Sequence, residues 1–247
     1  MIQHESRDFS AFSSAARAAA GDTVYPRSMA EGYQSGDIYT DGNAVLFHHF
    51  CGFAYLSGDP QQEFLDEIRM RFFAAPQKRR FILITDREDV TAFFAGQPEI
   101  AAEERRYFRA ENAPDIAVPE GFALEPLTAD LLPRLSGRII PSFSWESDAQ
   151  FLRSGFGFCI LHGTEIAACA FSAAVTADTV DIGVETAETF RRRGLAACAA
   201  AAVMRETVRQ GKAPVWACHA LNIGSAKTAQ ALGFQQTHTC TVLHRNS

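Results

Sequence analysis

The sequence predicts a mixed α/β protein built in two parts. Strand-like runs of β-branched and aromatic residues alternate with amphipathic helical patterns, which is the order expected of sheets covered by helices. Residues 112–121 contain two prolines and no periodic pattern, so they are expected to form a linker. We therefore place a smaller N-terminal α/β domain at residues 1–117 and a second α/β (α+β) domain at residues 118–247.

The first part is expected to alternate short helices and strands. Asp41-Gly42 lies between two strand-like runs and favours a tight hairpin. Asp59 and Pro60 suit the N-cap and the first position of a helix with one apolar stripe. The elements expected are a helix over 8–20, strands within 37–55, a helix from 60, a buried strand over 80–85, a short helix over 86–94 and a charged helix over 99–110.

The second part contains a hairpin that turns at His162-Gly163-Thr164, between strands over 157–162 and 165–174. No internal repeat is evident in the sequence. The other elements expected are a strand from 123, a helix over 127–139, a helix ending at 151–155, a strand over 179–186, a helix over 194–210, a strand over 215–219, a helix over 225–232 capped by Ser225, and strands over 235–244.

Composition excludes several classes of function. The chain has 247 residues, of which 47% are hydrophobic and 21% charged, which supports a soluble domain with a real core. A net charge of −6 argues against a nucleic-acid partner. No apolar run approaches the roughly 18 residues of a membrane span, and residues 1–8 lack the apolar stretch of a secretory signal.

The cysteines and the paired histidines do not have the pattern of a metal site. Six cysteines are scattered among apolar residues without C-x-x-C spacing, so we expect reduced thiols in a cytoplasmic protein. His48 and His49 are neighbours on an expected strand and would point to opposite faces of the sheet. We therefore expect structural histidines and no bound metal.

One turn in the second part suits an anionic ligand. The strand over 179–186 leads through Arg191, Arg192 and Arg193 to Gly194, where a helix begins. A helix N-terminus offers unpaired backbone N–H groups and the positive end of the helix dipole, and cations are unfavourable there without an anion. A pyrophosphate is therefore the expected ligand, and Gly194, which has no Cβ, lets it approach closely.

This turn resembles the signature of the GNAT superfamily of acetyltransferases, which use acetyl-coenzyme A. Arg191, Gly194 and Ala196 match its pattern Arg/Gln-x-x-Gly-x-Gly/Ala. A second hallmark, Asn-x-x-Ala/Ser followed by Leu-Gly-Phe, is matched by Asn222 and Ser225 with Leu232-Gly233-Phe234. The resemblance covers roughly residue 121 to the C-terminus. It implies the GNAT fold, a central, mixed and mostly antiparallel sheet flanked by helices.

Within the superfamily the chain looks most like the branch named for zwittermicin A resistance, which has a longer N-terminal region and a strand ending in Glu-Thr. The resemblance also implies where acetyl-CoA binds: the pyrophosphate on the turn, and the pantetheine arm along the end of the strand. The residues thereby assigned to the cofactor are Val184, Glu185, Thr186, Arg191, Arg192, Arg193, Gly194, Leu195, Ala196 and Asn222.

Acetyl transfer to an amine requires an acceptor for the amine proton and a donor for the departing thiolate. Glu185, at the strand end, is the first candidate for the base; it could also hold the ammonium group or be an ordinary surface acid. Asp181, on the same strand face, is the weaker candidate. His219 ends the neighbouring strand and could relay a proton near neutral pH.

The proton donor departs from the common pattern. Many members carry a tyrosine seven residues after the motif asparagine, and that position is Ala229 here. Ser225 is the favoured replacement, ahead of Thr228, Cys218 or water.

The expected function is an acyltransferase: a cytoplasmic N-acetyltransferase that moves an acetyl group from acetyl-CoA to a primary amine of a small molecule by direct attack. Two alternatives stay open, an acyl-CoA-binding sensor without transfer activity and a protein or peptide acetyltransferase. The N-terminal region could cover the acceptor site or mediate a homodimer, and the sequence does not decide between them.

Overall fold

The computed structural model describes residues 1–74 and 76–246, which form two compact units. The first unit is Met1–Arg106 together with the C-terminal segment from Thr239, and the second is Tyr107–His238. The division therefore lies ahead of the expected linker at 112–121, and the last strand returns to the first unit.

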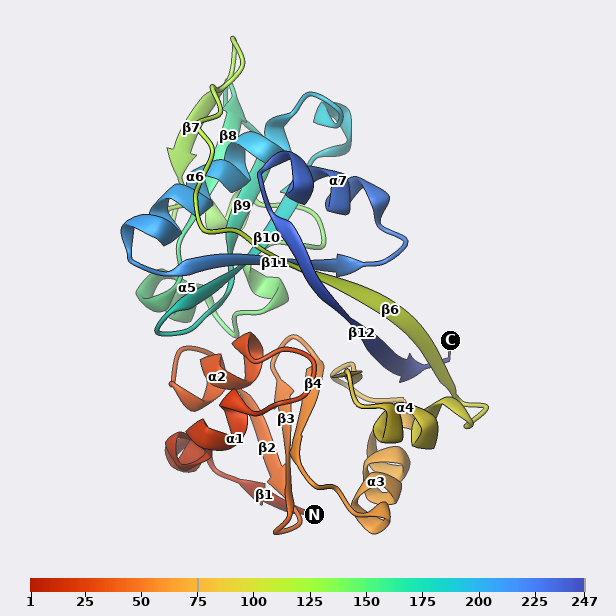
Figure 1. Ribbon diagram of the computed structural model, residues 1–247. Coiled ribbons are helices and arrows are strands. Elements are labelled where there is room, and N and C mark those ends of the chain that lie inside the picture. The colour runs from red at the N-terminus through yellow and green to blue at the C-terminus, as the bar shows by residue number, and fades with distance from the viewer. Residues whose placement is uncertain (75, 247) are drawn as a thin grey trace. The chain divides into compact units, whose positions relative to one another are not determined.

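The first unit begins with β1 (Ile2–His4), the 3-10 helix η1 (Ser6–Phe12), α1 (Ser13–Arg17) and α2 (Val24–Ala30) (Figure 1). It continues with β2 (Gly36–Thr40), β3 (Ala44–His49), β4 (Phe53–Gly58), α3 (Gln62–Ile68), the π-helical turn η2 (Arg69–Phe73), β5 (Ile82–Thr85) and α4 (Glu88–Ala95). The order of its strands is β1-β2-β3-β4-β5, and β5 pairs antiparallel with β12.

In the second unit, β7 (Ala123–Pro126), the 3-10 turns η3 (Leu132–Arg134) and η4 (Pro141–Phe143) and α5 (Asp148–Ser154) come first. They lead to β8 (Gly157–His162), β9 (Glu165–Val175), β10 (Thr179–Thr186), η5 (Glu188–Phe190), α6 (Leu195–Arg209), β11 (Ala213–His219) and α7 (Ile223–Ala231). The order of the strands is β7-β8-β9-β10-β11, followed by β6. Two strands, β6 (Ile100–Arg109) and β12 (Gln235–Arg245), cross the division and contribute residues to both units.

Both units have the same order of elements, although the sequence shows no repeat. In each, an edge strand and short helices precede three antiparallel strands, then a helix, a strand parallel to the third, a second helix and a last strand. The parallel neighbours are β4 and β5 in the first unit and β10 and β11 in the second. The ladders β1–β2, β2–β3, β3–β4, β5–β12, β7–β8, β8–β9 and β9–β10 are antiparallel. The prediction of a mixed, mostly antiparallel sheet flanked by helices is therefore confirmed.

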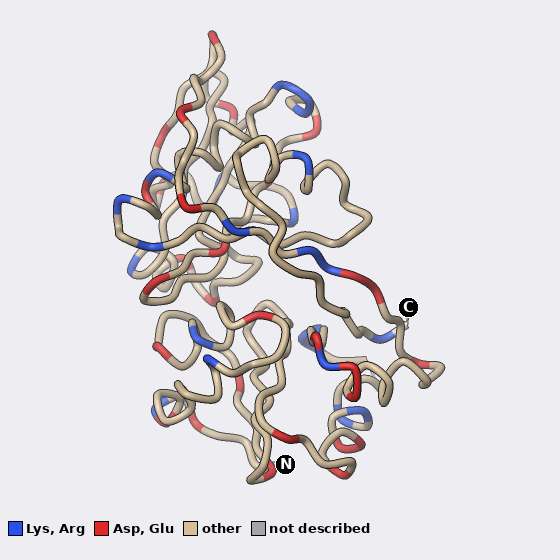
Figure 2. Tube along the Cα trace, viewed as in Figure 1, with Lys and Arg blue, Asp and Glu red and all other residues tan. Residues whose placement is uncertain are grey.

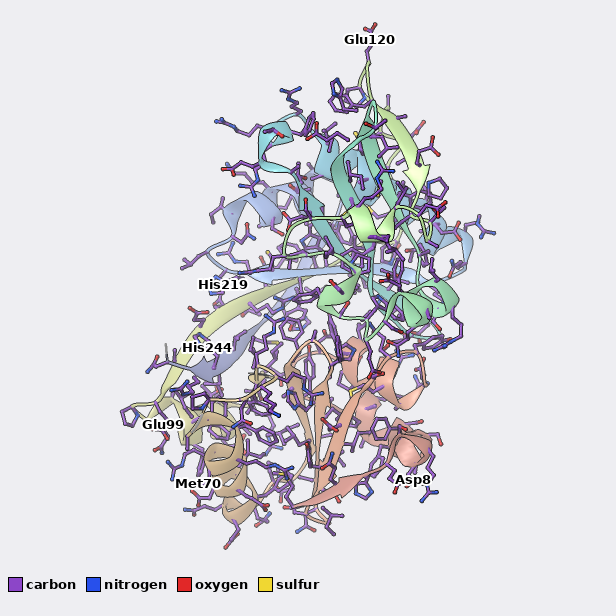
Figure 3. All side chains as sticks on the ribbon, turned by 180° about the vertical axis from the view of Figure 1, so that it is seen from behind. Asp8, Met70, Glu99, Glu120, His219 and His244 are labelled. Atoms are coloured by element: carbon purple, nitrogen blue, oxygen red, sulfur yellow. The ribbon has the colours of Figure 1, made fainter. Side chains whose placement is uncertain are left out.

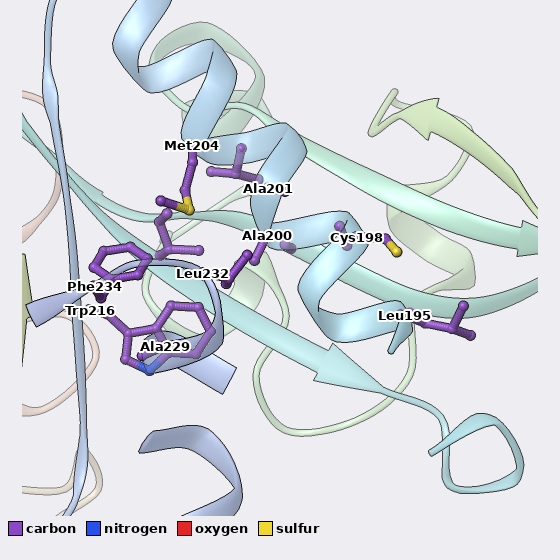
Figure 4. Close-up of a cluster of buried hydrophobic side chains, with 14 of the residues drawn as sticks. Leu195, Cys198, Ala200, Ala201, Met204, Trp216, Ala229, Leu232 and Phe234 are labelled. Atoms are coloured by element: carbon purple, nitrogen blue, oxygen red, sulfur yellow. The ribbon is translucent and has the colours of Figure 1, made fainter. Parts of the chain in front are cut away.

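The core of the second unit lies between its sheet and the alanine-rich helix α6. Figure 4 shows Leu195, Cys198, Ala200, Ala201 and Met204 of α6 beside Trp216, Ala229, Leu232 and Phe234, all of which are buried. Small alanine side chains let the helix approach β8, β9 and β10 closely, and alanine also favours helix. Packing on this face fixes where α6 begins, and therefore where the turn before it lies.

Two segments expected to be helices are not. Residues 100–109 form strand β6, which has strand neighbours on both edges, so ladder hydrogen bonds outweigh the helix propensity of the charged residues. Residues 127–139 contain only the turn η3, because Pro133 interrupts a helix and Gly137 has a φ of 116°. Contrary to the prediction, Asp59 is not the N-cap of the next helix, because α3 starts at Gln62 with Gln61 as its N-cap. The hairpin expected at Asp41-Gly42 is present, but its loop is the three residues 41–43 and not a two-residue turn. Asp41 Oδ1 accepts from the N–H of Asn43 and of Ala44.

His48 and His49 are buried as neutral rings in the first unit. Arginine can only donate, so Arg79 Nη2 donates to His48 Nδ1 at 2.6 Å, and His48 Nε2 donates to the Arg80 carbonyl at 3.1 Å. The N–H of Cys51 donates to His49 Nδ1 at 3.1 Å. Burial, helped by the Arg79 charge, lowers the pKa of His48 from 6.5 to about 4 and that of His49 to about 3.

We expect acid to destabilise the protein through these two rings. Below pH 6.5 the two histidines bind protons in the unfolded chain, whereas in the folded protein they stay neutral until the pH approaches 4. Their contribution to the stability of the folded protein is therefore complete above pH 6.5 and is lost as the pH falls. Each ring should lower the free energy of unfolding by about 2 kcal/mol between pH 7 and pH 5. Urea unfolding at both pH values checks this, with His49→Phe as the variant that should lose about half of the pH dependence. Equal pH dependence in the two proteins would contradict the prediction.

Candidate active site

Strands β10 and β11 separate after three residue pairs. Their parallel register runs from Thr179↔Ala213 to Asp181↔Val215 and then ends, while β10 continues to pair with β9 as far as Thr186. The N–H of Ala187 donates to Ala167 on the β9 side, and backbone groups alternate sides along a strand. Val184 therefore directs its N–H and C=O into the opening, where they meet no partner among the described residues.

The two faces of these strands have different surroundings. Ile182, Val184, Trp216 and Cys218 point into the core that α6 covers. Glu185 and His219 lie on the opposite face, since they differ from those residues by an odd number of positions. Each lies four residues beyond the last pair, Asp181 and Val215, so they stand at corresponding heights on the two sides of the opening.

The turn between β10 and α6 has the conformation of an anion site. Gly194 is the N-cap of α6 with a φ of 79°, and no side chain caps the helix. Arg192 has a φ of 64°, uncommon for a residue other than glycine. The first N–H groups of α6 therefore stay available, as predicted from the sequence. The positive φ favours glycine at position 194, and an added Cβ would meet no protein atom within 4 Å.

The three arginines of this turn are all exposed but differ in their contacts. Arg191 Nε donates to the Thr186 carbonyl at 3.4 Å, and the Arg193 guanidinium lies 5.5 Å from the centre of the Phe190 ring. Figure 2 shows the turn as a stretch of positive charge ahead of α6. Two of the arginines are thus held near the helix N-terminus. Leu195 is buried, so its contribution to a ligand is limited to its backbone N–H.

Glu185 is held by a loop that sequence reasoning missed. Its Oε2 accepts hydrogen bonds from the N–H groups of Arg138 and Ile139, both at 3.0 Å. The backbone of Gly137 also lies against this side chain, because an added Cβ would come within 2.5 Å of Glu185 Cγ. Pro133 and Gly137 inside a helix-like pattern were the signals that could have pointed to such a loop.

His219 is oriented by its own strand end. The N–H of Leu221 donates to His219 Nδ1 at 3.1 Å, so a neutral ring carries its proton on Nε2. Figure 3 labels His219 at the end of β11. In this tautomer the ring can donate a hydrogen bond from Nε2.

At the start of α7, Asn222 takes the capping role expected of Ser225. Asn222 is the N-cap, and its Oδ1 accepts from the N–H of Ser225 at 3.1 Å. Ser225 is therefore not the cap, and its hydroxyl accepts from Trp216 Nε1 at 3.0 Å. Ala229, in place of the common tyrosine, is fully buried in the core beside Trp216 (Figure 4).

The thiols near the site are buried and remain protonated. Cys169 is the register partner of both Glu185 and Cys159. Burial raises the pKa of the Cys169 thiol to about 12 and that of Cys159 to about 11. Cys218 and Asp181 are also buried. The Cys159 and Cys169 thiols are therefore not ready nucleophiles. Within residues 1–74 and 76–246 no cluster of three metal-ligating side chains occurs.

The first unit has the same opening, and its own chain fills it. Strands β4 and β5 pair over Phe53↔Ile82 to Tyr55↔Ile84 and then separate. The N–H of Ala20 donates to Leu56 O at 2.8 Å, and Arg87 Nη1 donates to Gly58 O at 2.5 Å. By register, Leu56 and Gly58 correspond to Ile182 and Val184 of the second unit.

The filling segment also lies against the other strand. A Cβ added at Gly21 would lie 3.3 Å from Ile84 Cγ2 and 3.4 Å from Thr85 Cα, and Cys240 Sγ donates to Gly21 O at 3.4 Å. Backbone groups that stay open in the second unit are thus satisfied internally in the first.

Three kinds of comparison relate the chain to known proteins. A family model described as GNAT acetyltransferase matches residues 19–243. An uncharacterized N-acetyltransferase of Bacillus subtilis (strain 168), YdfB, is 24% identical over 234 residues, covering 91% of this chain and 84% of that protein.

Among solved structures, a GCN5-related N-acetyltransferase-like protein from Streptococcus suis 89/1591 superposes with a TM-score of 0.76 at 20% identity, covering 98% of this chain and all of that one (100%). A GCN5-related N-acetyltransferase from Kribbella flavida gives 0.66 at 17% identity over 94% of this chain and 96% of that one. At these identities the two structures support the fold. No helix in the described part of the chain is long and apolar enough to cross a bilayer.

Proposed function

The chain belongs to the GNAT acetyltransferase family, and on that premise we propose that it transfers an acetyl group from acetyl-CoA to a primary amine of a small molecule. The observation that carries the proposal is the opening between β10 and β11, which has unpaired backbone groups at Val184 and ends beside a helix N-terminus with three arginines. An extended amide-bearing arm joined to a pyrophosphate has the chemistry that this arrangement matches.

The residues present fit such a cofactor. Val184 offers a backbone donor and acceptor to the pantetheine amides, with Glu185 and Thr186 completing the strand end. Gly194, Leu195 and Ala196 offer N–H groups to the pyrophosphate. The positive charge comes from Arg191 and Arg193, which are held at the turn, and from Arg192. Asn222 is committed to capping α7 through Oδ1, which leaves its amide N–H₂ to reach the arm.

Bound acetyl-CoA supplies an activated acyl group with a thiolate as leaving group. The amine nitrogen attacks the carbonyl carbon, the carbon–sulfur bond breaks, the amine loses one proton and the thiolate takes one. With Nδ1 accepting from Leu221, a neutral His219 ring can donate a hydrogen bond from Nε2 to the departing sulfur, but it is not the source of the proton, because loss of the Nε2 proton would leave an imidazolate. Ser225 stays the candidate donor favoured from the sequence, since its oxygen accepts from Trp216 Nε1 and that bond does not use its hydroxyl hydrogen.

Glu185 was first considered as the base. One of its oxygens already accepts two backbone hydrogen bonds, so a role in holding the loop at 137–139 competes with proton transfer. The finer resemblance to the zwittermicin A resistance branch and the alternatives of a homodimer, a sensor or a protein acetyltransferase remain predictions. The loop 137–139, which lies over the end of β10, favours a small acceptor over an extended peptide because it covers part of that face.

The test of the proposed function is thiol release from acetyl-CoA against a panel of small amines, aminoglycoside-type antibiotics and lysine peptides. Release that depends on one small amine supports the proposal. Release with lysine peptides alone would move the function to protein acetylation. Binding of acetyl-CoA without acceptor-dependent release would favour the sensor.

We further propose that only the second unit binds the cofactor, since the first fills its own opening with Ala20 and Arg87. Isothermal titration with coenzyme A should give one site per chain. Replacement of the three arginines at 191–193 should weaken that one site and leave no second site of unchanged affinity. A stoichiometry of two would show that the segment around Ala20 moves aside.

A further inference from the structure

The carboxylate of Glu185 is enclosed by three consecutive residues of a loop far away in the sequence. Oε2 accepts from the N–H of Arg138 and of Ile139, each at 3.0 Å. The backbone of Gly137 lies so close that a Cβ there would come within 2.8 Å of Glu185 Cδ and 3.0 Å of Oε2. With a φ of 116°, residue 137 also has a conformation that side-chain-bearing residues rarely adopt. Together these contacts form a seat for a carboxylate.

This seat replaces hydrogen bonds that a helix would have made. In a helix over 127–139, the N–H groups of Arg138 and Ile139 would donate to carbonyls four residues earlier. In the structure both donate to Glu185, so this side chain sets the path of the loop. The same loop packs on β10, since Ile139 Cγ2 lies 3.3 Å from where a Cβ of Gly183 would be.

The far end of the loop is held independently. Trp145 Nε1 donates to the Ser172 carbonyl at 2.8 Å, and Trp145 is fully buried. Glu185 and Trp145 are thus two side chains that hold the stretch between η3 and Trp145. Of these, only Glu185 lies at the end of β10 where that strand has left β11. Losing it would release the part of the loop beside the opening.

We infer that Glu185 is a positioning residue: it fixes residues 137–139 as a wall of the acceptor pocket and does not itself take the amine proton. The inference rests on the proposed function, because it assumes that the acceptor enters beside the opening of β10 and β11. A wall held by two hydrogen bonds to one oxygen requires that oxygen to stay where it is. With Oε2 accepting from two N–H groups, only Oε1 is left to face an amine.

Two substitutions separate positioning from proton transfer. Glu185→Gln keeps an oxygen that can accept both N–H groups but cannot act as a base, whereas Glu185→Ala removes both abilities. We expect Glu185→Gln to keep kcat within about fivefold of the parent protein, with an unchanged pH profile. Glu185→Ala should raise KM for the amine about tenfold or more, with KM for acetyl-CoA unchanged. Glu165→Ala, at an exposed acid on β9, is the matched control.

Amide hydrogen exchange of the full chain supplies a readout that does not depend on activity. Protection of the peptide spanning 137–140 should survive in Glu185→Gln and fall about tenfold or more in Glu185→Ala. If protection is unchanged in Glu185→Ala, the anchoring is wrong. If Glu185→Gln keeps protection but loses activity and the acidic limb of its pH profile, Glu185 is the base. If exchange behaves as expected but no amine is acetylated, the anchor stands and the proposed function fails.

Discussion

Replacing Arg191, Arg192 and Arg193 together with alanine is expected to weaken coenzyme A binding about 100-fold or more. Charge-assisted hydrogen bonds contribute about 1.5–3 kcal/mol each when desolvated and less when exposed, so two partly effective contacts give about 3 kcal/mol. The contacts of Arg191 with the Thr186 carbonyl and of Arg193 with the Phe190 ring place these charges near the N-terminus of α6. Loss of the charges leaves the helix N–H groups as the remaining phosphate ligands.

Calorimetry with coenzyme A measures this loss, and a matched triple variant controls for net charge. Arg109, Arg153 and Arg209 are exposed arginines of the second unit away from the turn, and their replacement removes the same charge. S-acetyl-pantetheine, which lacks the pyrophosphate, should be used equally well by the parent protein and the 191–193 variant. Equal weakening by both triple variants would show a general electrostatic effect and contradict a pyrophosphate site.

The site could be predicted from the sequence where its chemistry is local. The turn before α6 was predicted because arginines, a glycine and a helix start are adjacent in the chain, and a helix N-terminus has known ligand chemistry. The seat of Glu185 could not be predicted in this way, since Arg138 and Ile139 are separated from it by more than forty residues. Which donors a carboxylate meets depends on how the loop crosses the sheet, and local patterns contain no information about that.

Strands β10 and β6 show where local sequence patterns predict the fold and where strand neighbours decide it. The strand over 179–186 agrees with β10 residue for residue, because its apolar pattern and its turns both define it. Residues 99–110 were predicted as a helix because Glu-Glu-Arg-Arg favours one, yet two neighbouring strands recruit them into β6. One of the strand neighbours of β6, β12, lies at the C-terminal end of the chain. Pairing with these neighbours outweighs a local helix propensity of roughly a few tenths of a kcal/mol per residue.

The repeated order of elements went unrecognised because it is a property of topology and not of residue identity. A parallel pair that opens after three residues occurs in both units, at Tyr55↔Ile84 and at Asp181↔Val215. What differs is chemical: an arginine turn precedes α6, whereas Asp59 and Glu63 lie at the start of α3. Acidic residues there repel phosphate, which is consistent with an opening filled by the chain itself.

Replacing Trp145 with alanine is expected to destabilise the second unit by about 3–5 kcal/mol. The side chain is 1% exposed, packs edge-on against Phe151 with ring centres 5.7 Å apart, and donates from Nε1 to the Ser172 carbonyl at 2.8 Å. The packing is tight, because a Cβ added at Gly155 would lie 2.9 Å from Trp145 Cζ2. Alanine would leave a cavity and an unsatisfied buried carbonyl in the same place, and both terms act in the same direction.

Thermal unfolding and hydrogen exchange of the second unit measure the effect, expected as a fall of about 10 °C in the melting temperature. Trp145→Phe keeps most of the apolar contact and loses the hydrogen bond, so it should cost about 1–3 kcal/mol. Leu152→Ala, on the same segment but 45% exposed, should change stability by less than about 0.5 kcal/mol. If Trp145→Ala and Leu152→Ala have the same melting temperature, Trp145 does not anchor the loop. If Trp145→Ala has the expected lower melting temperature, Trp145 anchors the loop to β9, while Glu185 sets the path of the loop at β10. The proposed wall of the acceptor pocket then depends on both side chains.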